Sequence, residues 1–162
     1  MIFVGVDPGK NGAVAAVDDA GTVLGISRFV HAETEGRIAL VVLDFVAELD
    51  ADQIKAATIE RVGAMPRQGV ASMFTFGRVY GEAWAGLLTS QCRVFGVTPS
   101  TWQRDFGLPK AHATDNHKRT LKQAAEARFG RQFLLAEADA VWLAEWGRLH
   151  GPWSAKVRGV QP

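Results

Sequence analysis

Four carboxylates stand next to apolar segments, where a soluble chain rarely places a charge. Asp7 follows an apolar run that reads as a buried strand, and Glu60 ends a second such run. Glu137 and Asp139 lie where an apolar helix is expected to begin. An ionised carboxylate is costly to desolvate unless a cation or hydrogen bonds compensate it. If these groups converge, their mutual repulsion favours a divalent-cation site.

Carboxylate oxygens are the hard ligands that Mg²⁺ prefers. Asp7, Glu60 and Asp139, from separate elements, could together hold one or two Mg²⁺ ions. Two ions about 3.5–4 Å apart can activate a water and stabilise the leaving oxygen of a phosphodiester. Each residue alone has a simpler explanation: Asp7 as a turn residue, Glu60 as a strand-end residue paired with Arg61 or another base, and Asp139 as a helix N-cap. The combination favours the metal site.

The elements that must position these groups can be read from the apolar patterns. Strands are predicted over residues 1–6, 13–17, 22–29, 54–60 and 93–98, and helices over 35–49, 70–88, 114–129 and 139–149, with a short helix that carries Trp102. Three meandering strands followed by alternating helices and strands predict an α/β fold, a mixed five-stranded sheet with helices on both faces. Asp7 is expected in mid-sheet and Glu60 at the end of the neighbouring strand.

The length of 162 residues is most simply one domain. We expect that domain over residues 1–150 and an irregular tail over 151–162. No apolar stretch reaches the roughly 20 residues of a membrane span, and no signal peptide is evident. Cys92 is the only cysteine, which excludes an internal disulfide and a cysteine-based zinc cluster. A cytoplasmic protein without a membrane partner is expected.

Charge is unevenly distributed along the chain. Residues 1–100 hold 8 Lys/Arg against 11 Asp/Glu, a net −3, and residues 101–162 hold 10 against 6, a net +4. A basic segment beside an acidic site is typical of nucleases, which grip phosphates with one and hold metal with the other. An ordinary asymmetry of surface charge explains the counts equally well.

Four stretches in the same order resemble the RuvC-type Holliday junction resolvases. They are residues 4–9 with Gly12, Ala13 and Ala15; residues 59–62 with 65–78; residues 97–102; and residues 138–140. The second stretch looks like the version found in phage and related bacterial RuvC-like proteins, and the resemblance spans roughly residues 2–149. It implies an RNase H-like fold, a homodimer and a Mg²⁺-dependent endonuclease of DNA recombination and repair, working in a bacterial or phage-infected cell.

The resemblance also implies a ligand set. By position, Asp7, Glu60 and Asp139 match three of the family's four acidic metal ligands. The family places an Asp or His three residues before the last Asp, where this chain has Ala136. We predict that Glu137 substitutes by reaching in from the loop before the helix, because residues two apart do not share a helix face. Two Mg²⁺ ions per site are expected, with Mn²⁺ as a substitute.

Contacts with DNA are predicted from the same resemblance. Lys118 is favoured as the residue that stabilises charge at the scissile phosphate, against the alternative of a solvated helix face. The loop over residues 63–68 and the helix after it are expected to enter the junction centre, where an apolar side chain can stack on a base. The predicted DNA-binding residues are Met65, Arg67, Gln68, Phe74, Arg78, Lys110, His117, Lys118, Arg119 and Lys122.

Aromatic residues and glycines of the long helix over residues 70–88 raise the question of a dimer. Phe74 and Phe76 lie two apart, so one of them is expected to pack in the core or the dimer interface. Glycines 77, 81 and 86 could permit close helix approach across that interface. The tryptophans at 84, 102 and 142 are expected to lie in the core rather than to bind DNA.

The favoured function is a structure-selective DNA endonuclease that resolves four-way and related branched junctions by paired nicking. Two alternatives share its fold: a nuclease with relaxed preference among branched substrates, and a junction-binding module whose catalysis Ala136 has weakened. An actin-like or sugar-kinase ATPase also begins with a strand, an Asp-x-Gly turn and a hairpin. It needs two such lobes to enclose a nucleotide, and 162 residues supply one.

Overall fold

Strands and helices follow one another in the predicted order. The structure is a computed structural model, which describes residues 1–9, 11–30, 34–50, 52–53, 55–61, 63, 69–109 and 116–154. The strands are β1 (Ile2–Asp7), β2 (Ala13–Val17), β3 (Val23–Arg28), β4 (Lys55–Glu60) and β5 (Arg93–Val97). The helices are α1 (Arg37–Ala47), α2 (Val70–Thr89), α3 (Pro99–Asp105), α4 (His117–Phe129) and α5 (Leu135–His150).

The five strands form one mixed sheet in the order β3-β2-β1-β4-β5. The β1–β2 and β2–β3 pairs are antiparallel, while β1–β4 and β4–β5 are parallel. Val6 pairs with Ile59, so the carboxyl ends of β1 and β4 meet at the same edge of the sheet. This register brings Asp7 and Glu60, the last residues of the two strands, to that edge.

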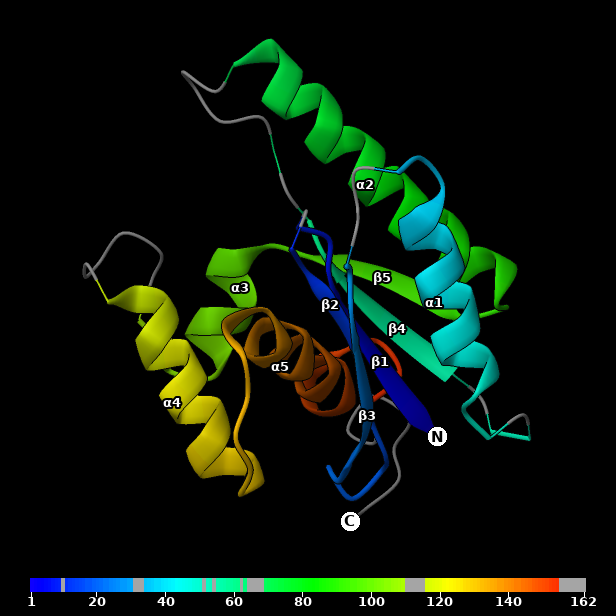
Figure 1. Cartoon of the computed structure of the whole chain (residues 1–162). Coiled ribbons are helices and arrows are strands. Elements are labelled where there is room, and N and C mark those ends of the chain that lie inside the picture. Colours follow the sequence, from blue (N-terminus) through cyan, green and yellow to red (C-terminus); the bar gives the residue numbers. More distant parts are fainter. Residues whose placement is uncertain are drawn as a thin grey trace.

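Helices cover both faces of the sheet, as predicted (Figure 1): α1 and α2 lie on one face and α3, α4 and α5 on the other. Side chains alternate between the two faces along each strand. Val4 and Val6 therefore pack in the core beneath α1 and α2. Phe3 packs with Ala144 of α5, and Asp7 shares the face of Phe3 because the two lie four residues apart.

Small residues let the backbone of α5 lie directly against the backbone of the sheet. A Cβ atom on Gly5 would stand 2.1 Å from the Ala140 carbonyl oxygen, and one on Gly147 would stand 2.4 Å from Thr58 Oγ1. Ala140 and Ala144 are fully buried in the same contact. Because nothing larger than hydrogen separates Gly5 from α5, the start of this helix comes to the edge where β1 and β4 end.

Helix α5 begins four residues earlier than predicted. Its first residue is Leu135, and Leu134 takes the N-cap position with an extended backbone. Glu137 closes the first turn, because its Oε2 accepts a hydrogen bond from the Leu134 N–H at 2.8 Å. Asp139 therefore lies within the helix rather than at its start, which overturns the N-cap explanation for this residue.

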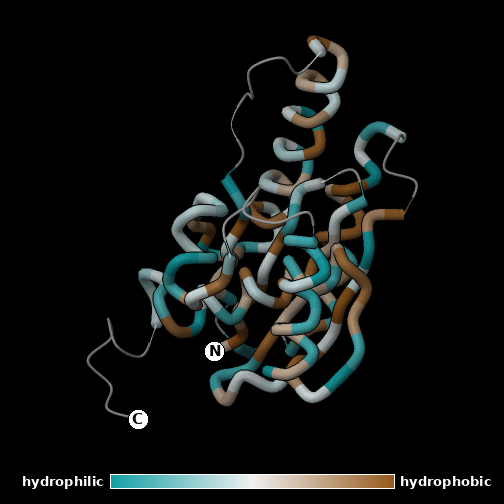
Figure 2. The backbone as a smooth tube through the Cα atoms, turned by 90° about the vertical axis from the view of Figure 1, so that its left-hand side faces the viewer, coloured by the Kyte–Doolittle hydropathy of each residue, from teal (hydrophilic) through white to brown (hydrophobic). Residues whose placement is uncertain are grey.

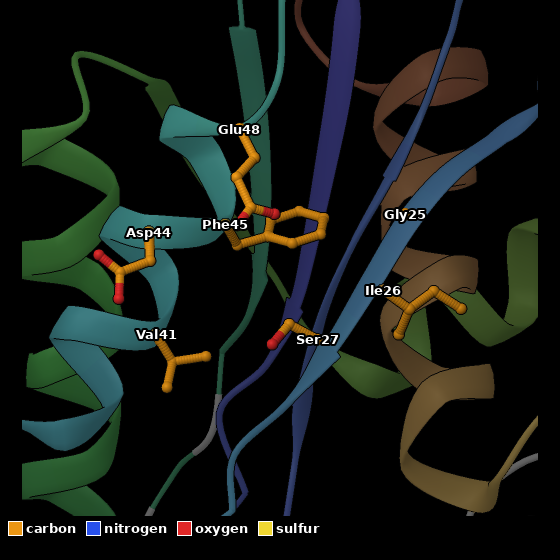
Figure 3. A pocket seen from close by; sticks show the side chains of 7 residues that line it. All are labelled: Gly25, Ile26, Ser27, Val41, Asp44, Phe45 and Glu48. Carbon is orange, nitrogen blue, oxygen red and sulfur yellow. The ribbon is translucent and has the colours of Figure 1, made fainter.

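Two surface features lie away from the carboxylates. The N-terminal half of α2 projects beyond the body of the molecule in two perpendicular views (Figures 1 and 2), and Val70 and Phe74 on it are 85% and 73% exposed. A hollow of about 300 Å³ opens between β3 and α1 (Figure 3), lined in part by Asp44, Phe45 and Glu48. Helix α1 covers the opposite face of the sheet from α5, so the hollow is separate from the carboxylates.

No helix among the described ranges is long and apolar enough to cross a membrane. The expected tail over residues 151–162 is described only as far as Ser154, whose backbone N–H donates to the Gly151 carbonyl oxygen at 3.0 Å. The predicted domain boundary at residue 150 stays a prediction.

Candidate active site

Three of the four predicted carboxylates come together on the α5 face of the sheet. Asp7 ends β1, Glu60 ends β4, and Asp139 lies in the second turn of α5. The charges of Asp7 and Glu60 both act on Asp139, and the charge of Asp7 acts on Glu60. The parallel β1–β4 register and the close contact of α5 with Gly5 account for this meeting of residues that are far apart in the sequence.

Burial and mutual repulsion keep these carboxyl groups from ionising easily. Burial, followed by the charge of Asp7, raises the pKa of Glu60 to about 7. Burial, followed by Asp7 and to a lesser degree Glu60, also raises the pKa of Asp139 to about 7. Burial raises the pKa of Asp7, although the Gly9 N–H donates to its Oδ1 at 3.1 Å. Among the described residues, the positive charge near the site does not offset the burial and mutual repulsion of these three groups.

Lys118 supplies the nearest positive charge that the described residues offer to this site. It lies on the first turn of α4, with its Nζ 3.7 Å from Asp139 Oδ2. Its charge lowers the pKa of all three carboxyl groups, against the larger effect of burial. The Lys118 side chain is 66% exposed, so one lysine both faces the carboxylates and remains open to solvent.

The donor set fits a hard cation with water in its coordination shell. In the described part of the chain, no group of three or more His, Cys, Asp and Glu side chains is arranged to hold a metal ion directly. Mg²⁺ does not require such a group, since it usually keeps several waters and takes one or two carboxylates. Three converging carboxylates with raised pKa values offer oxygen donors alone, which is the chemistry that Mg²⁺ selects.

Glu137 is engaged within its own helix. Its carboxylate caps the first turn of α5, and it lies on the helix rather than in the loop before it, so the predicted approach from that loop is wrong. A role as metal ligand stays a prediction, and it would require the capping bond to break. Ala136, three residues before Asp139, lies one turn away on the same helix face, partly buried against the core.

Trp102 is a contributor to the site that sequence reasoning placed only in the core. Its side chain is 1% exposed, as expected for a core residue, yet its indole N–H donates to Glu60 Oε1 at 2.9 Å. The sequence signal was indirect, since Trp102 lies in a short helix directly after the strand that pairs with β4. Trp142, also expected in the core, is 5% exposed on the α5 face of the sheet, and Trp84 is partly buried against the other core cluster, beneath α1 and α2.

The predicted DNA-binding residues fall into two groups, one on α4 beside the site and one on α2 away from it. On α4, Lys118 and Arg119 are exposed, Lys122 pairs with Glu126 at 3.0 Å, and His117 contacts the Pro109 carbonyl oxygen at 2.9 Å. On α2, Phe74 is exposed, Phe76 is partly buried, and Arg78 pairs with Glu82. The remaining candidates, Met65, Arg67, Gln68 and Lys110, lie outside the described residues.

Two solved structures resemble this chain over nearly its whole length. The structure of Thermus thermophilus RuvC matches with a TM-score of 0.64 and 18% sequence identity, over 89% of this chain and 91% of that one. T. thermophilus RuvC in complex with a Holliday junction substrate matches with a TM-score of 0.67 and 16% identity, over 93% and 98%. The chain has a RuvC-like fold. Neither a family model nor a curated protein sequence matches it.

The RuvC-like fold confirms the architecture that the four sequence motifs implied. Those motifs hold the end of β1, the end of β4, the β5–α3 connection and the first turns of α5, which carry or adjoin the carboxylates. The second motif also continues into the first half of α2, which lies away from them. At 16–18% identity the similarity shows the fold alone. The chemistry of the site therefore has to be argued from the residues of this chain.

Proposed function

We propose that this chain is a Mg²⁺-dependent, structure-selective DNA endonuclease that resolves four-way and related branched junctions by paired nicking. The observation that carries the proposal is the convergence of Asp7, Glu60 and Asp139 beside Lys118 on a RuvC-like fold. A similar structure was solved in complex with a Holliday junction substrate, which supports branched DNA as the ligand.

Asp7, Glu60 and Asp139 would hold the metal through their carboxylate oxygens, one or two of them directly and the rest through metal-bound waters. Bound Mg²⁺ would supply a water activated for attack and would neutralise charge on the phosphate. Lys118 would have a second role. Once bound metal neutralises Asp139, the Lys118 ammonium group would be free to leave Asp139 and to contact the scissile phosphate from the solvent side. A preorganised cation at that position stabilises the charge that develops in the transition state.

The two groups of predicted DNA contacts suit different parts of a junction. The exposed basic residues of α4, Lys118 and Arg119, lie beside the carboxylates and suit the phosphate backbone near the cut. The projecting half of α2 presents Val70 and Phe74, apolar side chains that suit unpaired bases at a branch point. Separate basic and apolar contacts favour a branched substrate over a plain duplex.

Paired nicking requires two sites, and we propose that a homodimer supplies them. Gly77 and Gly81 on α2 have open space where a side chain would stand, which leaves this face free for a partner helix. Gly86 does not belong to that face, since a Cβ atom there would stand 2.9 Å from the Ala39 carbonyl oxygen of α1. The three glycines would therefore serve two contacts, the proposed dimer at Gly77 and Gly81 and the packing of α1 on α2 at Gly86.

A catalytically weakened junction-binding module is the second candidate, and Ala136 is the observation that favours it. This apolar side chain occupies the turn of α5 before Asp139, on the same face. A carboxylate or imidazole at that position would add a ligand, and alanine adds none. A nuclease with relaxed preference among branched substrates would share the site described here and differ in its contacts outside it.

Cleavage of a synthetic four-way junction tests the proposal directly. The junction is incubated with Mg²⁺ or with EDTA, beside a linear duplex of matching sequence and a three-way branched control. Paired nicks on the junction that disappear in EDTA and in Asp7→Asn are the expected result. Tight binding without cuts in Mg²⁺ or Mn²⁺ would select the binding module, and equal cleavage of all branched substrates would select the relaxed nuclease.

A further inference from the structure

One hydrogen bond connects the core to the candidate metal site. The Trp102 indole N–H donates to Glu60 Oε1 at 2.9 Å, from a side chain that is 1% exposed. An indole has one donor and no acceptor, so a buried Trp102 requires an acceptor within reach. Among the described residues, the Glu60 carboxylate accepts this one side-chain hydrogen bond, through Oε1 and not through Oε2.

The backbone places Trp102 independently of anything bound at the site. Val97, the last residue of β5, pairs with Glu60 on β4. The chain then turns at Thr98, Pro99 begins α3, and the Trp102 N–H donates to the Thr98 carbonyl oxygen at 3.3 Å. Trp102 thus lies one helical turn beyond a residue that is held in register with Glu60.

We infer that Trp102 is a positioning residue for the metal site, whose indole holds Glu60 Oε1 and leaves Oε2 as the oxygen that binds the metal. The inference rests on the proposed function, because it takes Glu60 to be a ligand of Mg²⁺. A glutamate side chain loses rotamer freedom when it binds a metal. A hydrogen bond formed beforehand removes part of that loss, which strengthens metal binding.

The chemical nature of the donor suits this task. A lysine or arginine at the same place would also hold the carboxylate, but its charge would oppose the approach of Mg²⁺. The indole is neutral, so it orients Glu60 and leaves the negative charge of the site to the metal. Lys118, the charged neighbour of Asp139, is 66% exposed and can swing away, whereas Trp102 is fixed in the core.

Replacing Trp102 by phenylalanine removes the N–H and keeps most of the buried ring. Titration calorimetry of the metal-free protein with Mg²⁺ is expected to give about tenfold weaker binding for Trp102→Phe, the effect of one hydrogen bond to a charged group. Junction cleavage should recover most of its rate at saturating Mg²⁺, because orientation is lost and the ligand is kept.

Trp146→Phe is the matched control. Trp146 is 5% exposed and its indole also donates to a carboxylate, Asp105 Oδ2, at 3.0 Å, but Asp105 is not among the groups that act on the three site carboxylates. This variant should lose comparable thermal stability and bind Mg²⁺ as the unchanged protein does. A purely structural role of Trp102 predicts the same affinity for both variants.

A second measurement does not depend on the folding of a variant. In the unchanged protein, the ¹H–¹⁵N signal of the Trp102 indole should shift on addition of Mg²⁺, while the Trp146 indole signal stays in place. A silent Trp102 signal, or equal Mg²⁺ affinity of Trp102→Phe and the unchanged protein, would overturn the inference alone. If the unchanged protein binds no Mg²⁺, or Asp7→Asn binds it equally well, the proposed function fails and this inference fails with it.

Discussion

The backbone of Ala140 in α5 lies where a side chain of Gly5 in β1 would be. A Cβ atom on Gly5 would stand 2.1 Å from the Ala140 carbonyl oxygen. The contact lies two residues before Asp7 and one residue after Asp139. It therefore sets the separation of two carboxylates that come from opposite ends of the chain. Since both residues are small, the sheet and the helix bring these charges together before any metal binds.

Gly5→Ala should therefore damage both stability and the site. The added methyl group cannot fit without moving α5, a change that costs about 1–3 kcal/mol in a packed core. For a chain of this length that corresponds to a fall in Tm of several degrees. Gly69→Ala is the control, because its φ of −64° suits alanine and nothing lies within 4 Å. Equal Tm values for the two variants would contradict the close contact.

Stability of the metal-free protein should fall as pH rises from about 4 to about 7. In the folded state Glu60 and Asp139 have pKa values of about 7, above the ordinary 4.5 and 3.8, so folding binds protons. Their contribution is complete below pH 4 and is lost as pH passes 7. Thermal unfolding in EDTA measures this slope, which Asp139→Asn should flatten.

Mg²⁺ should reverse that loss at pH 8, since bound cation compensates the ionised carboxylates and stabilises the folded state that binds it. The rise in Tm on adding Mg²⁺ should be larger at pH 8 than at pH 6, where protons compete for the same oxygens. An equal rise at both pH values would contradict metal binding by these three groups.

The sequence was sufficient to predict the strands that carry Asp7 and Glu60, because buried parallel strands are continuous apolar runs that end sharply. It was insufficient for the start of α5. Leucine is a poor N-cap residue, and Leu134 caps this helix only because Glu137 reaches back to its N–H. The bond from Trp102 to Glu60 was also out of reach, since it depends on the β4–β5 register.

Lys118→Gln should slow cleavage about a hundredfold while leaving junction affinity nearly unchanged. The reason is that one preorganised charge near the transition state is lost, while other phosphate contacts remain. Single-turnover cleavage separates the chemical step from binding. Arg131→Gln removes a positive charge from the same basic segment at a residue stacked on Phe133, and it should cleave normally. Equal rates for the two variants would place Lys118 on a solvated helix face.

Ala136→Asp should strengthen Mg²⁺ binding and raise the cleavage rate. Because α5 already begins at Leu135, position 136 is helical and one turn from Asp139 on the same face, so a new carboxylate there points toward the existing three. Calorimetry with Mg²⁺ and single-turnover cleavage would both report the gain.

Glu137→Gln is the informative partner of that variant, because glutamine keeps an oxygen for the Leu134 N–H and removes the charge. A ligand role for Glu137 predicts a loss of Mg²⁺ affinity of tenfold or more, and capping alone predicts none. If Ala136→Asp gains nothing while Glu137→Gln loses binding, Glu137 leaves its cap and completes the site. If Ala136→Asp gains and Glu137→Gln is silent, three carboxylates are the full natural set and alanine limits the rate.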